Sequence, residues 1–251
     1  MKNNKNFLLE IGCEEIPARF MPSLLADLQA KSKELLTKER LAYSSINTYG
    51  TYRRLTLYIS NLAEKQQDLC QESKGPPAKI AIDENGTYLP PAIGFAKRLS
   101  IEPTELKVKE ENGQKYIFGT KNEKGQSSKE ILPKLLETLV FSLTLPIAMR
   151  WGCEQKTFIR PIHWLVSLYG KEIIPFEMFN IKSSNHSHGH RFLTKNTSQK
   201  LSAHGKKLII NSAQDYFTEM ENSFVIIDQN KRHKAILQFV NKNTEEYSKN
   251  L

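Results

Sequence analysis

The sequence has few cysteines and no long apolar run, and these absences exclude several classes of protein. Its three cysteines, Cys13, Cys70 and Cys153, lie far apart and form no CxxC pair. This pattern argues against a disulfide framework or a structural zinc site and fits a reducing cytosol. No segment approaches the roughly 18 apolar residues of a membrane span, and the N-terminal apolar run, which stops at Glu10, is too short for a signal peptide. We therefore expect a cytoplasmic protein without membrane contact.

Motifs of catalysis and nucleotide binding are also missing. The sequence contains no GxxxxGK[ST] loop and no GxGxxG, HExxH or GxSxG, and all of its glycines are isolated. An enzyme needs a positioned acid, base, nucleophile or metal, and no such set can be assembled from neighbouring residues here. The residues alone therefore predict a binding or scaffold part, with no catalytic residues, no metal and no bound cofactor.

The charge balance favours a polyanionic partner. The 251 residues include 36 Lys and Arg against 27 Asp and Glu, which gives a formal net charge of +9. Such an excess is typical of proteins that bind nucleic acid, although a Lys-rich composition also has other origins. Residues 182–251 hold 11 basic and 6 acidic residues, so the excess is biased toward the C-terminal end.

Hydrophobic periodicity predicts an α+β fold, with antiparallel or mixed sheets and packed helices in two or more subdomains. We place the subdomains at residues 1–125 and 126–251, with residues 121–128 or Gly170 as the boundary. Pro133 favours a late start for the helix that follows the Ser127 cap. The other predicted helices span residues 22–40, 92–99, 212–221 and a segment from Asp228. The predicted strands span residues 7–11, 51–59, 79–82, 173–179 and 224–227, with a hairpin at 106–109 and 115–120. The apolar run at residues 162–168 fits either a core strand or a short buried helix.

Arginines placed at the starts of elements are the candidate binding residues. Arg53 lies at the start of the strand at 51–59, where the alternation of Leu55, Leu57 and Ile59 predicts that Arg54 faces solvent. Pro161 favours an extended Arg160 with an outward side chain. Paired arginines can bind phosphate bidentately, but they can equally pair with carboxylates inside the fold. Both readings stay open. The full set of candidates is Arg53, Arg54, Arg150, Arg160, His190 and Arg191.

Three histidines at alternate positions, His186, His188 and His190, suggest a metal site as another alternative. Gly189 favours a bend there, and no cysteine or carboxylate lies close in the sequence. A loop that contacts an anion or a partner's carboxylate suits these residues better.

Seven blocks, in order and spread over nearly the whole chain, resemble the β subunit of two-subunit bacterial glycyl-tRNA synthetase. Cys13 and Tyr52 depart from that family's pattern, which usually has Thr and Pro at these positions. The blocks are residues 7–17 (FLLEIGCEEIP), 51–55 (TYRRL), 74–77 (KGPP), 94–96 (GFA), 149–152 (MRWG), 158–166 (FIRPIHWLV) and 189–192 (GHRF).

The resemblance implies an N-terminal fragment of a longer β subunit, inactive by itself. In this family the α subunit carries the active site, which uses ATP and Mg²⁺ to attach glycine to tRNA(Gly), and β contributes tRNA binding and assembly of the α2β2 heterotetramer. The candidate residues would then contact tRNA(Gly) or the α subunit. A purely architectural role is the alternative, with the same arginines paired to Glu10, Glu14 and Glu15.

Overall fold

The computed structural model describes residues 4–83, 86–111, 113–152, 155–194 and 204–248. For residues 245–248 it describes the backbone only. Its internal contacts divide the chain into two compact units. Unit 1 comprises residues 1–65 and 127–251, and unit 2 comprises residues 66–126. The chain thus leaves unit 1 after Lys65 and returns at Ser127, two residues that form an antiparallel β-bridge.

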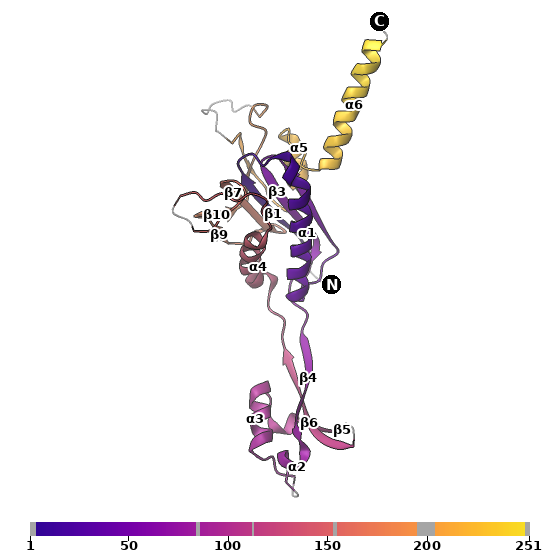
Figure 1. Cartoon of the computed structure of the whole chain (residues 1–251), viewed down its shortest axis with the longest axis vertical. Coiled ribbons are helices and arrows are strands. Elements are labelled where there is room, and N and C mark those ends of the chain that lie inside the picture. Colours follow the sequence, from indigo (N-terminus) through magenta and orange to yellow (C-terminus); the bar gives the residue numbers. More distant parts are fainter. Residues whose placement is uncertain (1–3, 84–85, 112, 153–154, 195–203, 249–251) are drawn as a thin grey trace. The chain divides into compact units, whose positions relative to one another are not determined.

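Unit 1 is built on one seven-stranded sheet with the order β2-β3-β1-β7-β10-β9, in which β8 also pairs with β7 (Figure 1). Neighbouring strands run antiparallel except β7 and β10, which are parallel. The strands are β1 (Lys5–Cys13), β2 (Ser45–Thr51), β3 (Arg54–Leu62), β7 (Ile162–Tyr169), β8 (Glu172–Ile173), β9 (Glu177–Met178) and β10 (Ile181–Ser184). Because β1 pairs with β7, residues from both predicted subdomains share this sheet. The sequence placed one division, at residues 121–128 or at Gly170, whereas the structure has two junctions, one after Lys65 and one before Ser127.

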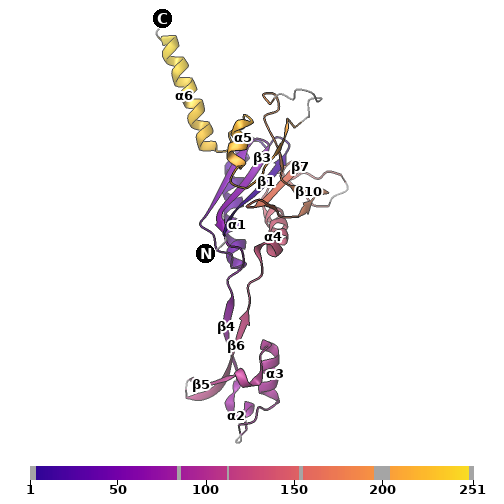
Figure 2. The same ribbon diagram turned by 180° about the vertical axis from the view of Figure 1, so that it is seen from behind.

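Both faces of the sheet are buried around β1. Phe7, Leu9 and Ile11 belong to a core with α1 (Met21–Lys38) and α4 (Ser128–Ser142), which lie side by side on one face (Figure 1). Leu8 on the other face packs in a second core that includes Tyr216 of α5 (Tyr216–Asn222), and Figure 2 shows α5 at that side of the sheet. A strand covered on both faces needs a near-continuous apolar run, which residues 7–11 supply apart from Glu10.

The helix α4 begins where its cap places it. The Ser127 hydroxyl accepts a hydrogen bond from the Lys129 backbone amide, and Pro133 lies inside the helix. The predicted later start is therefore wrong. The buried stripe that includes Leu132, Leu135 and Leu136 holds the helix against α1 and the sheet, and this packing outweighs the backbone hydrogen bond that Pro133 cannot make.

Unit 2 is a three-stranded antiparallel sheet with the order β4-β6-β5 and helices packed on it. The predicted hairpin is confirmed, but the predicted strand at residues 79–82 is wrong, because most of that segment forms one helical turn after Pro77. Ala81, Phe95 and Ile117 belong to its core. The elements are β4 (Leu69–Pro77), α2 (Ala78–Ala81), α3 (Pro90–Leu99), the 3₁₀ turn η2 (Pro103–Glu105), β5 (Lys107–Glu111) and β6 (Gln114–Glu123).

Four further elements complete unit 1: the 3₁₀ turn η1 (Ala18–Phe20), the paired strands β11 (His186–His188) and β12 (Lys207–Ile209), and α6 (Gln229–Ser248). The predicted strand at 224–227 is wrong, because this segment is irregular and packs Ile227 into the second core. No described helix is long and apolar enough to cross a membrane. The predicted α+β class, with several antiparallel and mixed sheets, is confirmed.

Candidate functional site

Most of the candidate residues gather at one edge of the unit 1 sheet. β1 ends at this edge, while its antiparallel neighbours β3 and β7 begin there, so Gly12 lies opposite both Arg54 and Trp164. The segments that follow β1 and precede β3 and β7 therefore meet. In this way residues more than 100 positions apart in the sequence become neighbours.

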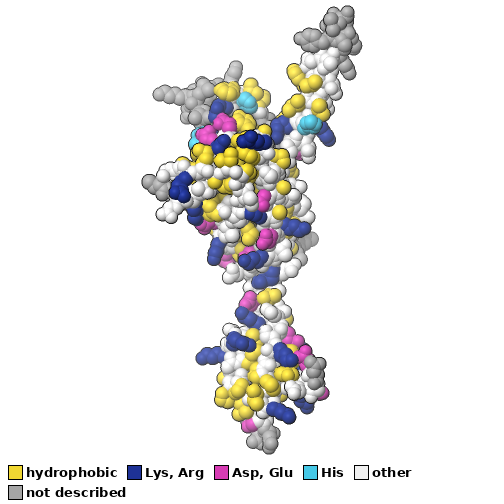
Figure 3. Space-filling model, viewed as in Figure 1, with side chains coloured by type: hydrophobic (Ala, Val, Ile, Leu, Met, Phe, Trp, Pro, Cys, Tyr) yellow, Lys and Arg dark blue, Asp and Glu magenta, His cyan; other side chains and the backbone are white. Residues whose placement is uncertain are grey.

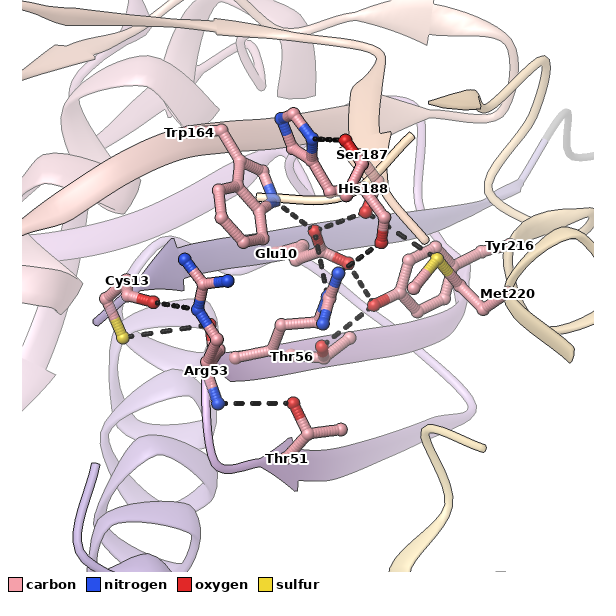
Figure 4. Close-up of polar contacts among 12 residues, drawn as sticks. Glu10, Cys13, Thr51, Arg53, Thr56, Trp164, Ser187, His188, Tyr216 and Met220 are labelled. Carbon is pink, nitrogen blue, oxygen red and sulfur yellow. Dashed lines mark hydrogen bonds and ion pairs between the residues drawn. The ribbon is translucent and has the colours of Figure 1, made fainter. Parts of the chain in front are cut away.

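A fully buried carboxylate, that of Glu10, organises this edge (Figure 4). Its Oε1 accepts hydrogen bonds from the Trp164 indole and from the Ser187 hydroxyl, the latter at 2.6 Å. Its Oε2 accepts one from the Tyr216 hydroxyl. The Arg54 Nε lies 3.7 Å from Oε1 and forms an ion pair with it. A buried charge is stable only when it is paired and hydrogen-bonded, and Glu10 meets both conditions.

Arg54 is buried, so the prediction that it faces solvent is wrong. Its exposed fraction is 5 %, and its Nη2 donates to the backbone carbonyl of His188 on β11. The predicted alternation along β3 is present, but the second face of the strand is covered by β11 and α5 instead of water. The ion pair with Glu10 is one of the internal pairs that the architectural reading expected.

Arg53 lies beside this cluster and is also buried, with an exposed fraction of 3 %. Its Nε donates to the Cys13 carbonyl at 3.3 Å, and its Nη2 lies 2.7 Å from the His204 Nδ1. Burial lowers the pKa of Arg53, and the charge of Arg191 lowers it further. Burial also lowers the pKa of His204 to about 4, with further contributions from His163 and Arg53.

Two glutamates just after β1, Glu14 and Glu15, interact with other cationic side chains at this edge. Arg160 donates from Nε to the backbone carbonyl of Glu15 at 3.0 Å, and the Arg191 Nη2 lies 3.4 Å from the Glu15 carboxylate. The His163 Nε2 lies 2.5 Å from the Glu14 carboxylate. Arg150 is exposed.

A pocket of about 330 Å³ opens at this edge. Among the residues that the structure describes, its lining includes no carboxylate but four arginines and two histidines: Arg53, Arg54, Arg191, Arg232, His190 and His204. Four of the six predicted site residues thus line one pocket, and Arg150 and Arg160 do not. The sequence reasoning missed Arg232 and His204, which only the folding of residues 204–232 over the sheet brings to Arg53. Figure 3 shows Lys and Arg side chains beside hydrophobic ones at this end of unit 1, near the base of α6.

The three alternate histidines do not converge on a common point. The His190 Nδ1 accepts from the backbone amides of Phe192 and Leu193, and the His188 Nδ1 lies 3.4 Å from the Gly205 carbonyl. Among the described residues, no three His, Cys, Asp or Glu side chains are placed to share a metal ion. Burial raises the pKa of the Cys13 thiol to about 12, so it is not a reactive thiolate near neutral pH.

Fold and pocket together define an α+β protein with an arginine- and histidine-lined pocket at a sheet edge. The family model of the glycyl-tRNA synthetase beta subunit matches residues 7–251, so the chain belongs to that family. It is 39% identical over 233 residues to the glycine–tRNA ligase beta subunit of Natranaerobius thermophilus and 40% identical over 232 residues to that of Moorella thermoacetica. The corresponding protein of Listeria welshimeri is 38% identical over 235 residues.

These alignments cover nearly the whole chain but only part of each relative. They include 93%, 92% and 94% of the chain, in the same order, and 32% of each relative. The chain therefore spans about a third of the length of the curated relatives it matches.

Proposed function

We propose that this chain is the N-terminal part of a glycine–tRNA ligase beta subunit and contributes to tRNA binding and subunit assembly. The complete enzyme would attach glycine to tRNA(Gly) with ATP and Mg²⁺, and the alpha subunit would supply the active site and bind both cofactors. The family membership supports the ligase assignment. The cation-lined pocket in unit 1 is the observation that carries the tRNA-binding part of the proposal.

The distribution of charge supports an RNA surface in unit 1. Unit 2 holds nine basic and nine acidic residues, so the entire net charge of +9 resides in unit 1. Nucleic-acid affinity comes largely from neutralising phosphates with Lys and Arg, and a neutral unit contributes little to it. Unit 1 is therefore the part that we expect to contact tRNA.

The architectural alternative applies to some of the candidate residues and not to others. Arg54 is committed to Glu10 and to the His188 carbonyl, which is a structural role. Arg53 and Arg191 line the pocket, and Arg191 also forms a long ion pair of 3.4 Å with Glu15, as the architectural alternative expects. Arg150 is exposed and lies outside the pocket lining, which fits a contact with tRNA or the alpha subunit.

The test is binding of the purified chain to tRNA(Gly), with a second tRNA as control, at low salt and near 0.15 M salt. We expect binding that weakens steeply with salt, as counterion release requires. An absence of binding at low salt would remove the tRNA role and leave the architectural one. In that case co-purification with the alpha subunit would test the assembly role separately.

A further inference from the structure

Two of the four arginines in the pocket lining, Arg53 and Arg232, are held by backbone carbonyl groups, whereas Arg54 and Arg191 form ion pairs with Glu10 and Glu15. Arg232 donates from Nη1 to the carbonyls of Ile226 and Ile227, at 2.6 and 3.1 Å, and from Nη2 to that of Gly50 at 2.8 Å. Arg53 is held in a similar way by the Cys13 carbonyl. Carbonyl groups orient a guanidinium group but leave its unit charge in place. Burial lowers the pKa of both arginines, while nearby carboxylates, Asp228 for Arg232 and Glu14 and Glu15 for Arg53, act in the opposite direction.

Arg191 offers an unused donor at the same pocket. Its Nη2 makes one long contact of 3.4 Å to Glu15, whose side chain is half exposed. Its Nε is buried and has no acceptor among the described residues. A buried donor without a partner costs free energy, and an anion in the pocket would supply the missing acceptor.

Two aromatic side chains in the lining of this pocket are largely exposed. Tyr52 is 54 % exposed and Phe224 is 58 % exposed. Phe224 has a φ of 61°, a left-handed backbone conformation that is strained for a bulky residue and rarely adopted without a functional or packing reason. Exposed rings beside a cationic groove are the recurring arrangement of proteins that stack the bases of single-stranded nucleic acid.

We propose that this pocket binds a backbone phosphate of single-stranded RNA through Arg53, Arg191 and Arg232, with a neighbouring base stacked on Phe224 or Tyr52. The proposal deepens the proposed function and rests on it. An acidic peptide would satisfy the arginines but gives the two exposed rings no role. Duplex RNA would satisfy the arginines as well, but its bases are stacked and paired and cannot reach a ring. Single-stranded RNA matches both features.

The experiment measures binding of a fluorescent single-stranded RNA of about eight nucleotides to the whole chain over a series of salt concentrations. Removing one phosphate contact lowers the log–log salt slope by about 0.7 for a single strand, so we expect this loss for Arg191→Gln. Arg98→Gln, an exposed arginine in the neutral unit 2, is the matched control and leaves the slope unchanged.

Phe224→Asn tests the stacking and does not depend on the arginine variant. Asn tolerates the left-handed backbone, so the fold is retained, and we expect affinity to fall about tenfold or more. Phe239→Asn is the control, because Phe239 on α6 is 71 % exposed and lies outside the pocket lining. Thermal melts confirm that each variant is folded.

The outcomes separate this proposal from the proposed function. Unchanged RNA binding by both Arg191→Gln and Phe224→Asn, with tRNA(Gly) binding intact, would overturn the pocket proposal alone. Displacement of the RNA by polyglutamate together with a silent Phe224→Asn would point to an acidic protein as occupant and would also overturn it. If the unmodified chain does not bind tRNA(Gly) even at low salt, the proposed function itself has failed.

Discussion

At the scale of single residues, Glu10 connects the candidate site to the fold. It is the one charged residue in the buried run of β1, and its partners come from β3, β7, β11 and α5. The residues that cover the second face of the sheet are thus fixed through one carboxylate. Arg54 is placed by the same group, and its neighbour Arg53 is turned toward the pocket.

Replacing Glu10 with Gln should destabilise the chain strongly. The amide keeps the shape, but it leaves the Arg54 charge without a counter-ion, and its NH₂ group cannot accept from Tyr216. Removing one partner of a buried ion pair costs about 3–5 kcal/mol. Urea unfolding followed by circular dichroism measures the change, with Glu137→Gln, from an exposed pair with Lys156, as control. Equal midpoints for the two variants would contradict the role of Glu10.

Stability should fall as the pH is lowered from about 6.5 to about 4. The pKa of His204 is lowered to about 4, first by burial, so over this range the unfolded chain binds a proton that the folded chain does not. The contribution of neutral His204 to the free energy of unfolding is therefore fully present above the unfolded pKa of about 6.5, and it is lost as the pH falls toward 4. Burial lowers the pKa of His188 and adds to the effect with the same sign. Unfolding midpoints across this range should decline less steeply for His204→Gln, and an unchanged slope would contradict this assignment.

Glu14 contributes in a lower pH window. Burial alone would raise its pKa, but the hydrogen bond and charge of His163 lower it overall. A carboxylate with a lowered pKa stabilises the fold above its unfolded pKa of about 4.5, and this contribution is lost as the pH falls further. The two residues together predict a decline in stability over two successive pH ranges.

At the scale of elements, the antiparallel pairing of β1 with β7 depends on a glycine, Gly12, which lies opposite Trp164. A Cβ at Gly12 would lie 1.8–2.3 Å from the Trp164 indole, whereas a Cβ at Gly94 in α3 would meet no atom within 4 Å. Gly12 is therefore required by packing, and Gly94 is not. The two positions offer a matched pair of Gly→Ala substitutions.

Gly12→Ala should destabilise unit 1 by about 3 kcal/mol or more, because neither the strand nor the buried ring can move away. Gly94→Ala should instead stabilise α3 by about 0.5–1 kcal/mol, since Ala restricts the unfolded chain and adds no clash. Calorimetric melts of the two variants provide the measurement. A neutral Gly12→Ala would mean that the Trp164 ring has room to shift.

At the scale of the whole molecule, unit 2 is an insertion whose removal should leave unit 1 intact. Lys65 and Ser127 form a β-bridge, so a short Gly-Ser linker can join the two ends without strain. The chain without residues 66–126 should fold cooperatively and keep the salt slope of RNA binding, because unit 1 carries the whole net charge. Aggregation of this variant, or loss of RNA binding, would show that unit 2 contributes to folding or to recognition.

The sequence alone determined the elements whose signals are local. The apolar stripe predicted a helix at residues 22–40, close to α1, and the Asn-Gly turn predicted the hairpin of β5 and β6. The order of short motifs likewise led to the family. Periodicity, turns and motifs are properties of neighbouring residues, so no knowledge of distant contacts was needed.

Only the tertiary structure decided what Arg54 faces and which residues join it. Alternation along β3 shows two faces, but whether the second face meets water or α5 depends on a segment 160 residues away. The pocket depends on long-range contacts in the same way, since Arg232 reaches the Gly50 carbonyl and His204 reaches Arg53. Burial and charge compensation arise when distant segments pack together, and a pattern read along the chain does not contain that information.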